Sequence, residues 1–255
     1  MTAEVEAVTL DAFVDSMDRY KASVGNSTLV VAVSGGPDSM ALCRLACEWS
    51  EYYGIKVVGL TVDHNLRESS AAEALQVSEW LNVFGMEHHT LSWGEGRDYL
   101  NRSKSPQSDA RDARYHILCN WCNQNGASVI LTGHHSDDQV ETFLYRLIRG
   151  SGIDGLAAMD VHIKRSGISI VRPLLQFSKS NLVATCNTFN QPYIQDFSNH
   201  DEKYTRVRIR KLITEFAKEG LDQDRLLNTI AHIRRAKSAI TSFVDQFMED
   251  HVVRH

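Results

Sequence analysis

The sequence lacks several features that would assign the chain to a special class. No apolar run reaches the length of a membrane span, so we expect no membrane-embedded segment and no membrane partner. The chain begins with the acidic stretch MTAEVEAVTLDAF, which has neither the basic nor the apolar region of a secretory signal. Cysteine is scarce and odd in number, and four of the five cysteines lie at helical spacings in apolar-periodic segments: Cys43, Cys47, Cys119 and Cys122. This usage predicts reduced thiols and a cytoplasmic location.

Positive charge is also in deficit, with 27 Lys and Arg against 32 Asp and Glu and a net charge of −5. A uniformly acidic protein would be a poor partner for nucleic acid. The charge is uneven, however, because residues 203–255 carry 11 basic and 7 acidic side chains. The basic end is compatible with a polyanionic partner and equally with a solvated helical face, so composition leaves both open.

Runs of β-branched residues alternate with helical patterns through the first 150 residues. The strand-like runs are Leu29–Val33, Lys56–Val62, His88–Leu91 and Ser128–Thr132. The helical patterns are Asp38–Tyr53, Ser70–Phe84, Gln107–Gln124 and Asp137–Ile148. This alternation predicts right-handed βαβ units and an α/β fold, a Rossmann-like parallel sheet with helices on both faces. Because Ser34, Asp63 and Gly133 each follow a strand, we expect them at the ligand-binding edge of that sheet.

The pattern changes after Gly150. A glycine-rich connection leads to the stretch VHIKRSGISIVRPLL, which we interpret as a β-hairpin. Three helical segments are then expected, at residues 178–189, 204–218 and 222–248.

The stretch LVVAVSGGPDSMAL, residues 29 to 42, has the form of a phosphate-binding turn. Gly35 and Gly36 allow close backbone approach, and Pro37 suits the first turn of a helix. With the hydroxyls of Ser34 and Ser39, the free amides of that helix start would form an anion site. The loop matches neither the Walker A nor the dinucleotide-binding fingerprint, and it contains no lysine or arginine.

Asp38 puts a negative charge beside the expected phosphate. That charge is unfavourable unless a divalent cation lies between the two, and Mg²⁺ is usually held by a carboxylate together with substrate phosphates. We therefore predict that Asp38 holds Mg²⁺ through the nucleotide, with arginines from elsewhere supplying further positive charge. The alternative is a plain strand–turn–helix with a tight Gly-Gly corner.

The loop SGGPDS resembles the SGGxDS loop of the PP-loop ATP pyrophosphatases, which cleave ATP between the α and β phosphates. Four further segments resemble tRNA(Ile)-lysidine synthetases, which modify the wobble cytidine of an isoleucine tRNA. These segments are LTVDHNLRESSAAEA, SDARDARYHIL, ILTGHHSDDQVETFLYRLIRGSGIDGLAAM and IQDFSNHDEKYTRVRIR. The likeness runs in the family's order from about Leu29 to Arg210.

A carboxylate cluster follows the fourth strand, where Asp137 and Glu141 share a helix face with Asp138 beside it. With His134 and His135 of the same stretch these acids could bind a metal, but the spacing fits no common structural zinc site, whereas acids can hold an ammonium group or Mg²⁺. At least one of them could instead complement the helix dipole. The resemblance implies that all three recognise free L-lysine and that Asp137 takes part in catalysis.

Arg111 and Arg114 lie three residues apart on one face of a helix. The resemblance implies that they face ATP and the adenylated intermediate as catalytic residues, while their alternative is an ion-paired surface with Asp109 or Asp112. The resemblance also implies a nucleotide site that consists of Ser34, Gly35, Gly36, Pro37, Asp38, Ser39, Asp63, His64 and Gly133.

The basic stretch KYTRVRIRK is the expected tRNA contact, through Arg206, Arg208, Arg210 and Lys211. Two residues depart from the family's pattern D-P-S-N…R-N-x-I-R: Phe197 replaces the proline, and Val207 replaces the asparagine after the first arginine. Loss of that proline frees a backbone angle in this loop.

The resemblance implies an ATP- and Mg²⁺-dependent ligase that joins L-lysine to the wobble cytidine in the anticodon loop of tRNA(Ile). We expect residues 1–212 to form the catalytic domain and residues 213–255 a helical extension, with no further tRNA-binding domains. The alternatives are another PP-loop adenylating enzyme, such as a tRNA thiolase or an amide-forming synthetase, and a non-catalytic adenine-nucleotide-binding protein. A thiolase would use cluster-binding cysteines, but Cys119 and Cys122 lie in a helical pattern that favours core packing. The sequence does not determine the oligomeric state and is compatible with a homodimer.

Overall fold

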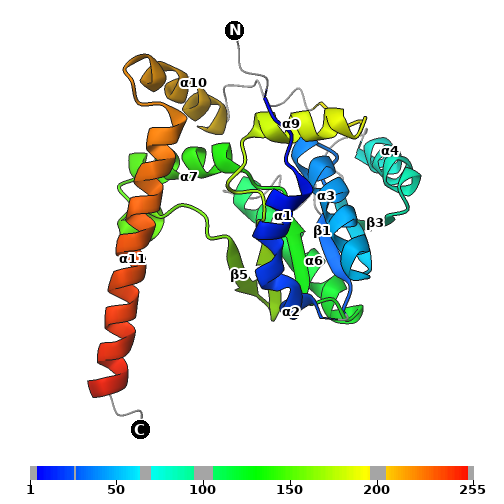
Figure 1. Cartoon of the computed structure of the whole chain (residues 1–255), viewed down its shortest axis with the longest axis horizontal. Helices are drawn as coiled ribbons and strands as arrows, with labels where there is room; N and C mark the ends of the chain where they lie inside the picture. Colours follow the sequence, from blue (N-terminus) through cyan, green and yellow to red (C-terminus); the bar gives the residue numbers. More distant parts are fainter. Residues whose placement is uncertain (1–4, 26, 64–69, 95–105, 196–204, 252–255) are drawn as a thin grey trace. The chain divides into compact units, whose positions relative to one another are not determined.

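The computed structural model describes residues 5–25, 27–63, 70–94, 106–195 and 205–251. Within these ranges six strands form one sheet in the order β3-β2-β1-β4-β6-β5 (Figure 1). The strands are β1 (Leu29–Ala32), β2 (Val57–Asp63), β3 (Glu87–Ser92), β4 (Val129–Thr132), β5 (His162–Arg165) and β6 (Ile168–Val171). Each of the four predicted strands lies within about a residue of its expected bounds, and β5 and β6 form the predicted hairpin.

Helices connect and cover the strands. They are α1 (Leu10–Met17), the 3₁₀ helix η1 (Asp18–Tyr20), α2 (Lys21–Val24), α3 (Pro37–Tyr53), α4 (Ser70–Val83), α6 (Pro106–Gln124), α7 (Ser136–Ile148), α8 (Ile153–Leu156), α9 (Lys179–Thr188), α10 (Thr205–Lys218) and α11 (Gln223–His251). The long helix α3 starts with Pro37 in its first turn and ends at Gly54, which adopts a left-handed conformation with φ 65°. No helix in the described part of the chain is long and apolar enough to cross a bilayer.

The order of the strands creates a switch point beside β1. Strand β1 pairs in parallel with β2 on one side and with β4 on the other, with Ala32 opposite Leu60 and Thr132. Strands β2 and β3, and β4 and β6, are also parallel, whereas β5 runs antiparallel to β6. The chain reverses its direction across the sheet between β1 and β4, which is where open α/β sheets bind ligands. The predicted Rossmann-like architecture is confirmed.

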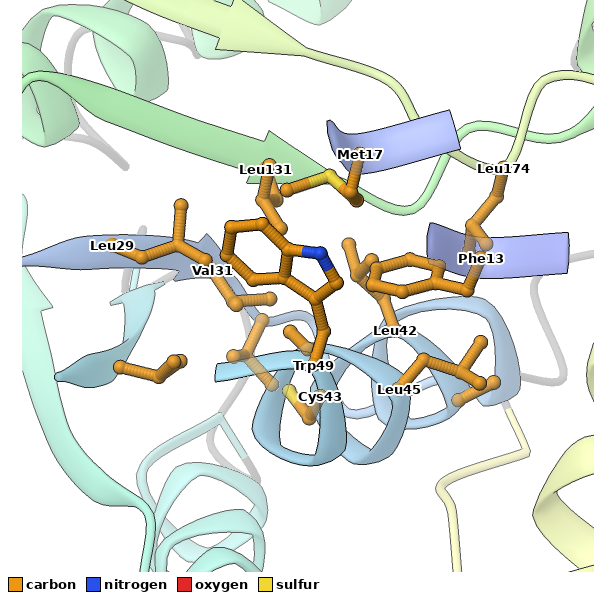
Figure 2. Packing of buried hydrophobic residues seen from close by; sticks show 14 of the residues in the cluster. Phe13, Met17, Leu29, Val31, Leu42, Cys43, Leu45, Trp49, Leu131 and Leu174 are labelled. Atoms are coloured by element: carbon orange, nitrogen blue, oxygen red, sulfur yellow. The ribbon is translucent and has the colours of Figure 1, made fainter. Parts of the chain in front are cut away.

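Alternate residues of the central strands face two separate cores. Leu29 and Val31 of β1 belong to the larger core, which α1, α3, α4 and α9 cover. In Figure 2 the indole of Trp49 lies among side chains of β1, β4 and α1. Val30 of β1 belongs to the other core, which packs against α6. Helices therefore cover both faces, as the sequence predicted.

The chain forms two compact units. The first holds the sheet with η1, α1, α2, α3, α4, α6 and α9, and the second holds α7, α8, α10 and α11. The apolar core of the second unit includes Val140, Phe143, Leu144, Ala158, Ile209, Leu226 and Ile230. The boundary expected after residue 212 falls inside α10. Helix α7 packs against both α10 and α11, and α8 packs against α11, so all four helices belong to the second unit. The compact units thus have different bounds from the expected domains.

Candidate functional site

The turn after β1 is held by residues from two other segments of the first unit. Gly35 has φ +82°, and a Cβ there would lie 2.7 Å from Ile194 Cδ1 and 2.8 Å from Val77 Cγ2. The Gly35 carbonyl also accepts a hydrogen bond from the Ile194 amide at 2.8 Å. Only glycine combines this backbone conformation with so little space, so the local geometry requires the first glycine of the motif.

Buried Ser39 fixes the other side of the turn. Its hydroxyl accepts a hydrogen bond from the Ser34 amide at 3.2 Å and lies 3.0 Å from the Gly36 carbonyl, to which it donates. No side chain caps α3 at Gly36, and Pro37 contributes no amide to the first turn. The amides of Asp38 and Ser39 therefore start a helix that presents its positive dipole end without a side-chain cap, as an anion site requires.

Gly133 brings the end of β4 against this turn. A Cβ at Gly133 would lie 2.9 Å from the carbonyl oxygen of Asp38 and 3.1 Å from the Ser39 amide nitrogen. Both atoms are backbone atoms at the start of α3, so neither can move aside as a side chain could. The structure thus brings together the first and third of the three predicted strand ends.

Two basic side chains flank the Asp38 carboxylate. Oδ2 of Asp38 lies 3.7 Å from Nε2 of His135 and 4.0 Å from Nζ of Lys179. Both distances exceed those of a hydrogen bond, and the Lys179 ammonium attracts the carboxylate electrostatically. Oδ1 of Asp38 is buried and has no hydrogen-bond partner among the described residues. The carboxylate therefore retains an oxygen that could accept a ligand.

Asp63 ends β2, which is the strand adjacent to β1. It is 9% exposed, and its carbonyl accepts a hydrogen bond from the Trp93 amide at 2.8 Å. Its position at the carboxyl end of the strand agrees with the expectation, but its contact with ribose or adenine stays a prediction. His64 lies outside the described residues.

Arg111 and Arg114 both lie on α6, on the opposite face of the sheet from α3. The Arg111 guanidinium lies 5.2 Å from the ring centroid of Tyr115, and its Nη2 is 3.5 Å from the Tyr115 hydroxyl. Asp112, one of the alternative partners, instead forms an ion pair with Arg165 at 2.9 Å. Arg114 is exposed. Phosphate binding by these two arginines stays a prediction.

The second unit contains the acidic cluster on α7. Glu141 is 2% exposed, and its Oε1 accepts a hydrogen bond from Nε of Arg210 at 2.5 Å. Burial raises the pKa of Glu141, while Arg210 acts in the opposite direction. Asp137 accepts a hydrogen bond from Gln223 of α11 at 2.9 Å. Glu141 and Arg210 are therefore partners of each other, although the sequence assigned Glu141 to lysine and Arg210 to tRNA.

The remaining predicted tRNA-binding residues lie on the exposed side of α10. Arg206, Arg208 and Lys211 are exposed, and Arg208 donates a hydrogen bond to Thr205 at 3.1 Å. Val207, one of the departures from the family pattern, is 8% exposed and faces inward. The helix thus separates an apolar inner side from a basic outer side, but its contact with tRNA stays a prediction.

Comparison with known proteins identifies the family. The PP-loop domain matches residues 8–216 of the chain. A tRNA(Ile)-lysidine synthase of a Bradyrhizobium species is 42% identical over 222 residues, which are 86% of this chain and 61% of that protein. A tRNA(Ile)-lysidine synthase of Methylobacterium nodulans is 35% identical over 249 residues, which are 98% of this chain and 72% of that protein. The chain belongs to the tRNA(Ile)-lysidine synthase family.

The comparisons also bear on the cofactor, the length of the chain and the fold. The PP-loop domain implies that ATP is used, which agrees with the uncapped turn before α3. The chain spans 61% of the length of the Bradyrhizobium synthase. Among solved structures, the U34-tRNA thiolase NcsA of Methanococcus maripaludis has a TM-score of 0.68 at 14% identity, covering 88% of this chain and 80% of that one. At this identity the likeness shows the fold alone.

The cysteines of the C-x-x-C pair pack as the sequence predicted. Cys119 and Cys122 are 1% and 0% exposed in the core between α6 and the sheet. Burial, with a smaller effect of Cys119, raises the pKa of Cys122 to about 12. Thiols in this environment stay protonated at neutral pH and behave as apolar groups.

Sequence reasoning assigned no role to His135 and Lys179, the two basic residues beside Asp38. His135 belongs to the motif GHHSDDQVET, but its position in the sequence does not distinguish it from His134. Lys179 starts α9, 141 residues after Asp38. The sequence does contain one signal for its orientation: the spacing of Lys179 from Leu182 and Cys186 places all three on one helix face.

Proposed function

We propose that this chain catalyses ATP-dependent addition of L-lysine to carbon 2 of the wobble cytidine in an isoleucine tRNA with the anticodon CAU. The observation that carries this proposal is the uncapped start of α3 at a sheet switch point, with Asp38 beside it. Membership of the lysidine synthase family supplies the identity of the acceptor and of the amine.

In the first step the oxygen on carbon 2 of the cytidine attacks the α-phosphorus of ATP. One phosphorus–oxygen bond forms to the base, the bond to the bridging α–β oxygen breaks, and pyrophosphate leaves with that electron pair. The amides at the start of α3 and the turn of Ser34, Gly35 and Gly36 would bind the departing phosphates. Arg111 and Arg114 would stabilise charge on the α-phosphate, as the resemblance to the family implies.

The Asp38 carboxylate fits a Mg²⁺ ion that is carried by ATP. Its Oδ1 has no hydrogen-bond partner among the described residues, and a carboxylate oxygen is the ligand that Mg²⁺ prefers. The bound ion would neutralise phosphate charge that would otherwise repel Asp38.

In the second step the ε-amine of lysine, after losing a proton, attacks carbon 2 of the adenylated base. A carbon–nitrogen bond forms, the carbon–oxygen bond breaks, and AMP leaves with the oxygen. We assign the lysine ammonium to Asp137 and Asp138, and Asp137 is the candidate base for the proton. Glu141 is largely committed to Arg210, so its contribution would be to hold α7 against α10.

The exposed side of α10 is our candidate tRNA surface. Arg206, Arg208 and Lys211 would contact backbone phosphates, which predicts binding that weakens as salt increases. Arg210 would then support the surface from behind through Glu141 instead of meeting the tRNA directly. The wobble base must leave its stack to react, which suits a single-stranded anticodon loop.

Incorporation of radiolabelled lysine into tRNA transcripts tests this function. The expected result is label in the acid-precipitable tRNA with the anticodon CAU, dependent on ATP, and none with UAU, in which uridine replaces the wobble cytidine. Label that does not depend on the wobble base, or no label although ATP and tRNA both bind, would contradict the proposal.

A further inference from the structure

The phosphate turn contains no cation of its own, and a helix from elsewhere in the first unit brings one to it. Lys179 is the first residue of α9, and its Nζ lies 4.0 Å from Oδ2 of Asp38. The Lys179 side chain is 40% exposed and that of Asp38 is 27% exposed, so solvent and ligands can reach the pair.

Packing of α9 against α3 determines this position. Lys179, Leu182 and Cys186 follow each other at helical spacings of three and four residues, so they lie on one face of α9. Leu182 and Cys186 are both fully buried in the larger core. Cys186 also donates a hydrogen bond from its thiol to the Pro37 carbonyl at 3.4 Å. With two members of the face anchored beside the start of α3, the third places its ammonium at the turn.

Hydrogen bonds of the segments before and after α9 also fix the helix beside the phosphate turn. After the helix, the Ile194 amide donates to the Gly35 carbonyl, inside the phosphate turn. At the start of the helix, the Ser178 side chain accepts a hydrogen bond from the Asn181 amide in a capping box. The first turn of α9 is therefore capped, whereas the first turn of α3 is not. Helix α9 contributes a side-chain cation, and α3 contributes backbone amides.

We infer that Lys179 is a phosphate-binding residue that contacts the β- and γ-phosphates of ATP and the pyrophosphate released from it. Without nucleotide its ammonium offsets the charge of Asp38 at a distance too long for a hydrogen bond. With nucleotide the flexible side chain moves to the phosphate oxygens, as a lysine acting as a point charge can. When the bond between the α-phosphorus and the bridging oxygen breaks, the negative charge that develops on pyrophosphate lies beside Lys179. This role rests on the proposed function only for the identity of the acceptor, because the phosphates are those of ATP in any case.

Binding of three ligands to the full chain, without tRNA or lysine, tests the inference. Isothermal titration would measure dissociation constants for inorganic pyrophosphate, MgATP and AMP in the parent, Lys179→Met and Lys179→Arg proteins. We expect Lys179→Met to bind pyrophosphate and MgATP about ten- to a hundredfold more weakly, because a hydrogen bond to a charged group is lost. AMP has no β-phosphate, so its affinity should stay within about twofold, and Lys179→Arg should restore much of the loss.

Lys56→Met is the matched control. Lys56 precedes β2 at the opposite edge of the sheet and forms an exposed ion pair with Glu87 at 2.6 Å. Its replacement should leave all three affinities unchanged. If Lys179→Met unfolds, Lys179→Gln retains a polar side chain and is measured in its place. An unchanged pyrophosphate affinity, or equal losses for AMP and pyrophosphate, would overturn the inference.

These measurements separate the inference from the proposed function. Loss of pyrophosphate binding in Lys179→Met supports the role of Lys179 even if the parent protein adds no lysine to tRNA. Conversely, lysine addition by a Lys179→Met protein with unchanged pyrophosphate affinity would support the function and refute the role of Lys179.

Discussion

The ion pair between Glu141 and Arg210 offers a stability prediction with a defined pH dependence. The Glu141 side chain is 3% exposed, and Arg210 donates to its Oε1, while Oε2 has no hydrogen-bond partner among the described residues. Burial raises the pKa of Glu141 above its ordinary value even with Arg210 present. Arg210 therefore supplies part of the stabilisation of the charged carboxylate, against the effect of burial.

Arg210→Ala removes the guanidinium and leaves the buried carboxylate unbalanced. Removal of one partner from a buried ion pair costs about 3 to 5 kcal/mol, and we expect the lower end because the Arg210 side chain is 40% exposed. Glu141→Gln should cost only about 1 kcal/mol, because the amide oxygen can still accept from Arg210 and no charge remains buried. At pH 7.5 we therefore expect Arg210→Ala to lose more free energy of unfolding than Glu141→Gln.

The loss in Arg210→Ala should shrink at low pH. A carboxyl group whose pKa is raised by folding favours the folded state below its unfolded pKa of about 4.5, and this advantage is lost as the pH rises through the folded pKa. Without Arg210 the pKa of Glu141 rises further, so the free energy of unfolding should approach that of the parent between pH 7.5 and pH 5. A protein with both Arg210→Ala and Glu141→Gln lacks the titrating carboxyl group. Its free energy of unfolding should therefore not approach that of the parent as the pH falls.

Urea unfolding followed by far-UV circular dichroism at both pH values measures these effects. Arg208→Ala is the control, because Arg208 is exposed on the same helix and its loss should change stability by less than about 0.5 kcal/mol. All four tryptophans precede residue 122, so their fluorescence reports on unfolding of the first unit. The midpoint of the fluorescence transition should therefore lie at the same urea concentration in Arg210→Ala as in the parent protein. An equal loss in Arg210→Ala at both pH values, or a loss no larger than that of Arg208→Ala, would refute the reasoning.

Three further predictions concern the first unit. Gly133→Ala should weaken MgATP binding at least tenfold in a titration, because its Cβ would meet the Asp38 carbonyl, whereas Gly94→Ala, with open space around it, should bind normally. The pKa of His88 is lowered to about 4 by burial and by His89, so the free energy of unfolding should fall as the pH drops from about 6.5 toward 4. A His88→Asn protein with the same pH dependence would contradict that cause. Burial raises the pKa of Cys122 to about 12, and a thiol titration at pH 7.5 should find it unreactive until the protein unfolds.

The strands and the phosphate turn could be predicted from local sequence alone. The run Leu29–Ala32 is short, apolar and contains two β-branched valines, and Gly35 is required by a positive φ that few other residues adopt. The N-terminal helix α1 was not predicted. Its Phe13 and Met17 are four residues apart and fully buried beside Trp49, but this stretch is too short to give a clear period by itself.

The partners of charged residues could not be predicted, because they come from distant parts of the sequence. Glu141 and Arg210 are 69 residues apart, and each alone fits a ligand-binding role. Lys179 looks like an ordinary lysine at the start of a helix until α9 packs on α3. Local sequence determines which residues can form a turn, whereas tertiary packing determines which charges meet there.

Pyrophosphate release from MgATP, measured with and without a tRNA(Ile) transcript bearing CAU, tests the central claim most directly. We predict release that requires the transcript, proceeds with its wobble cytidine but not with uridine, and is abolished in Asp38→Ala. Release at the same rate without tRNA would contradict the account, because another acceptor would then be adenylated at the turn before α3.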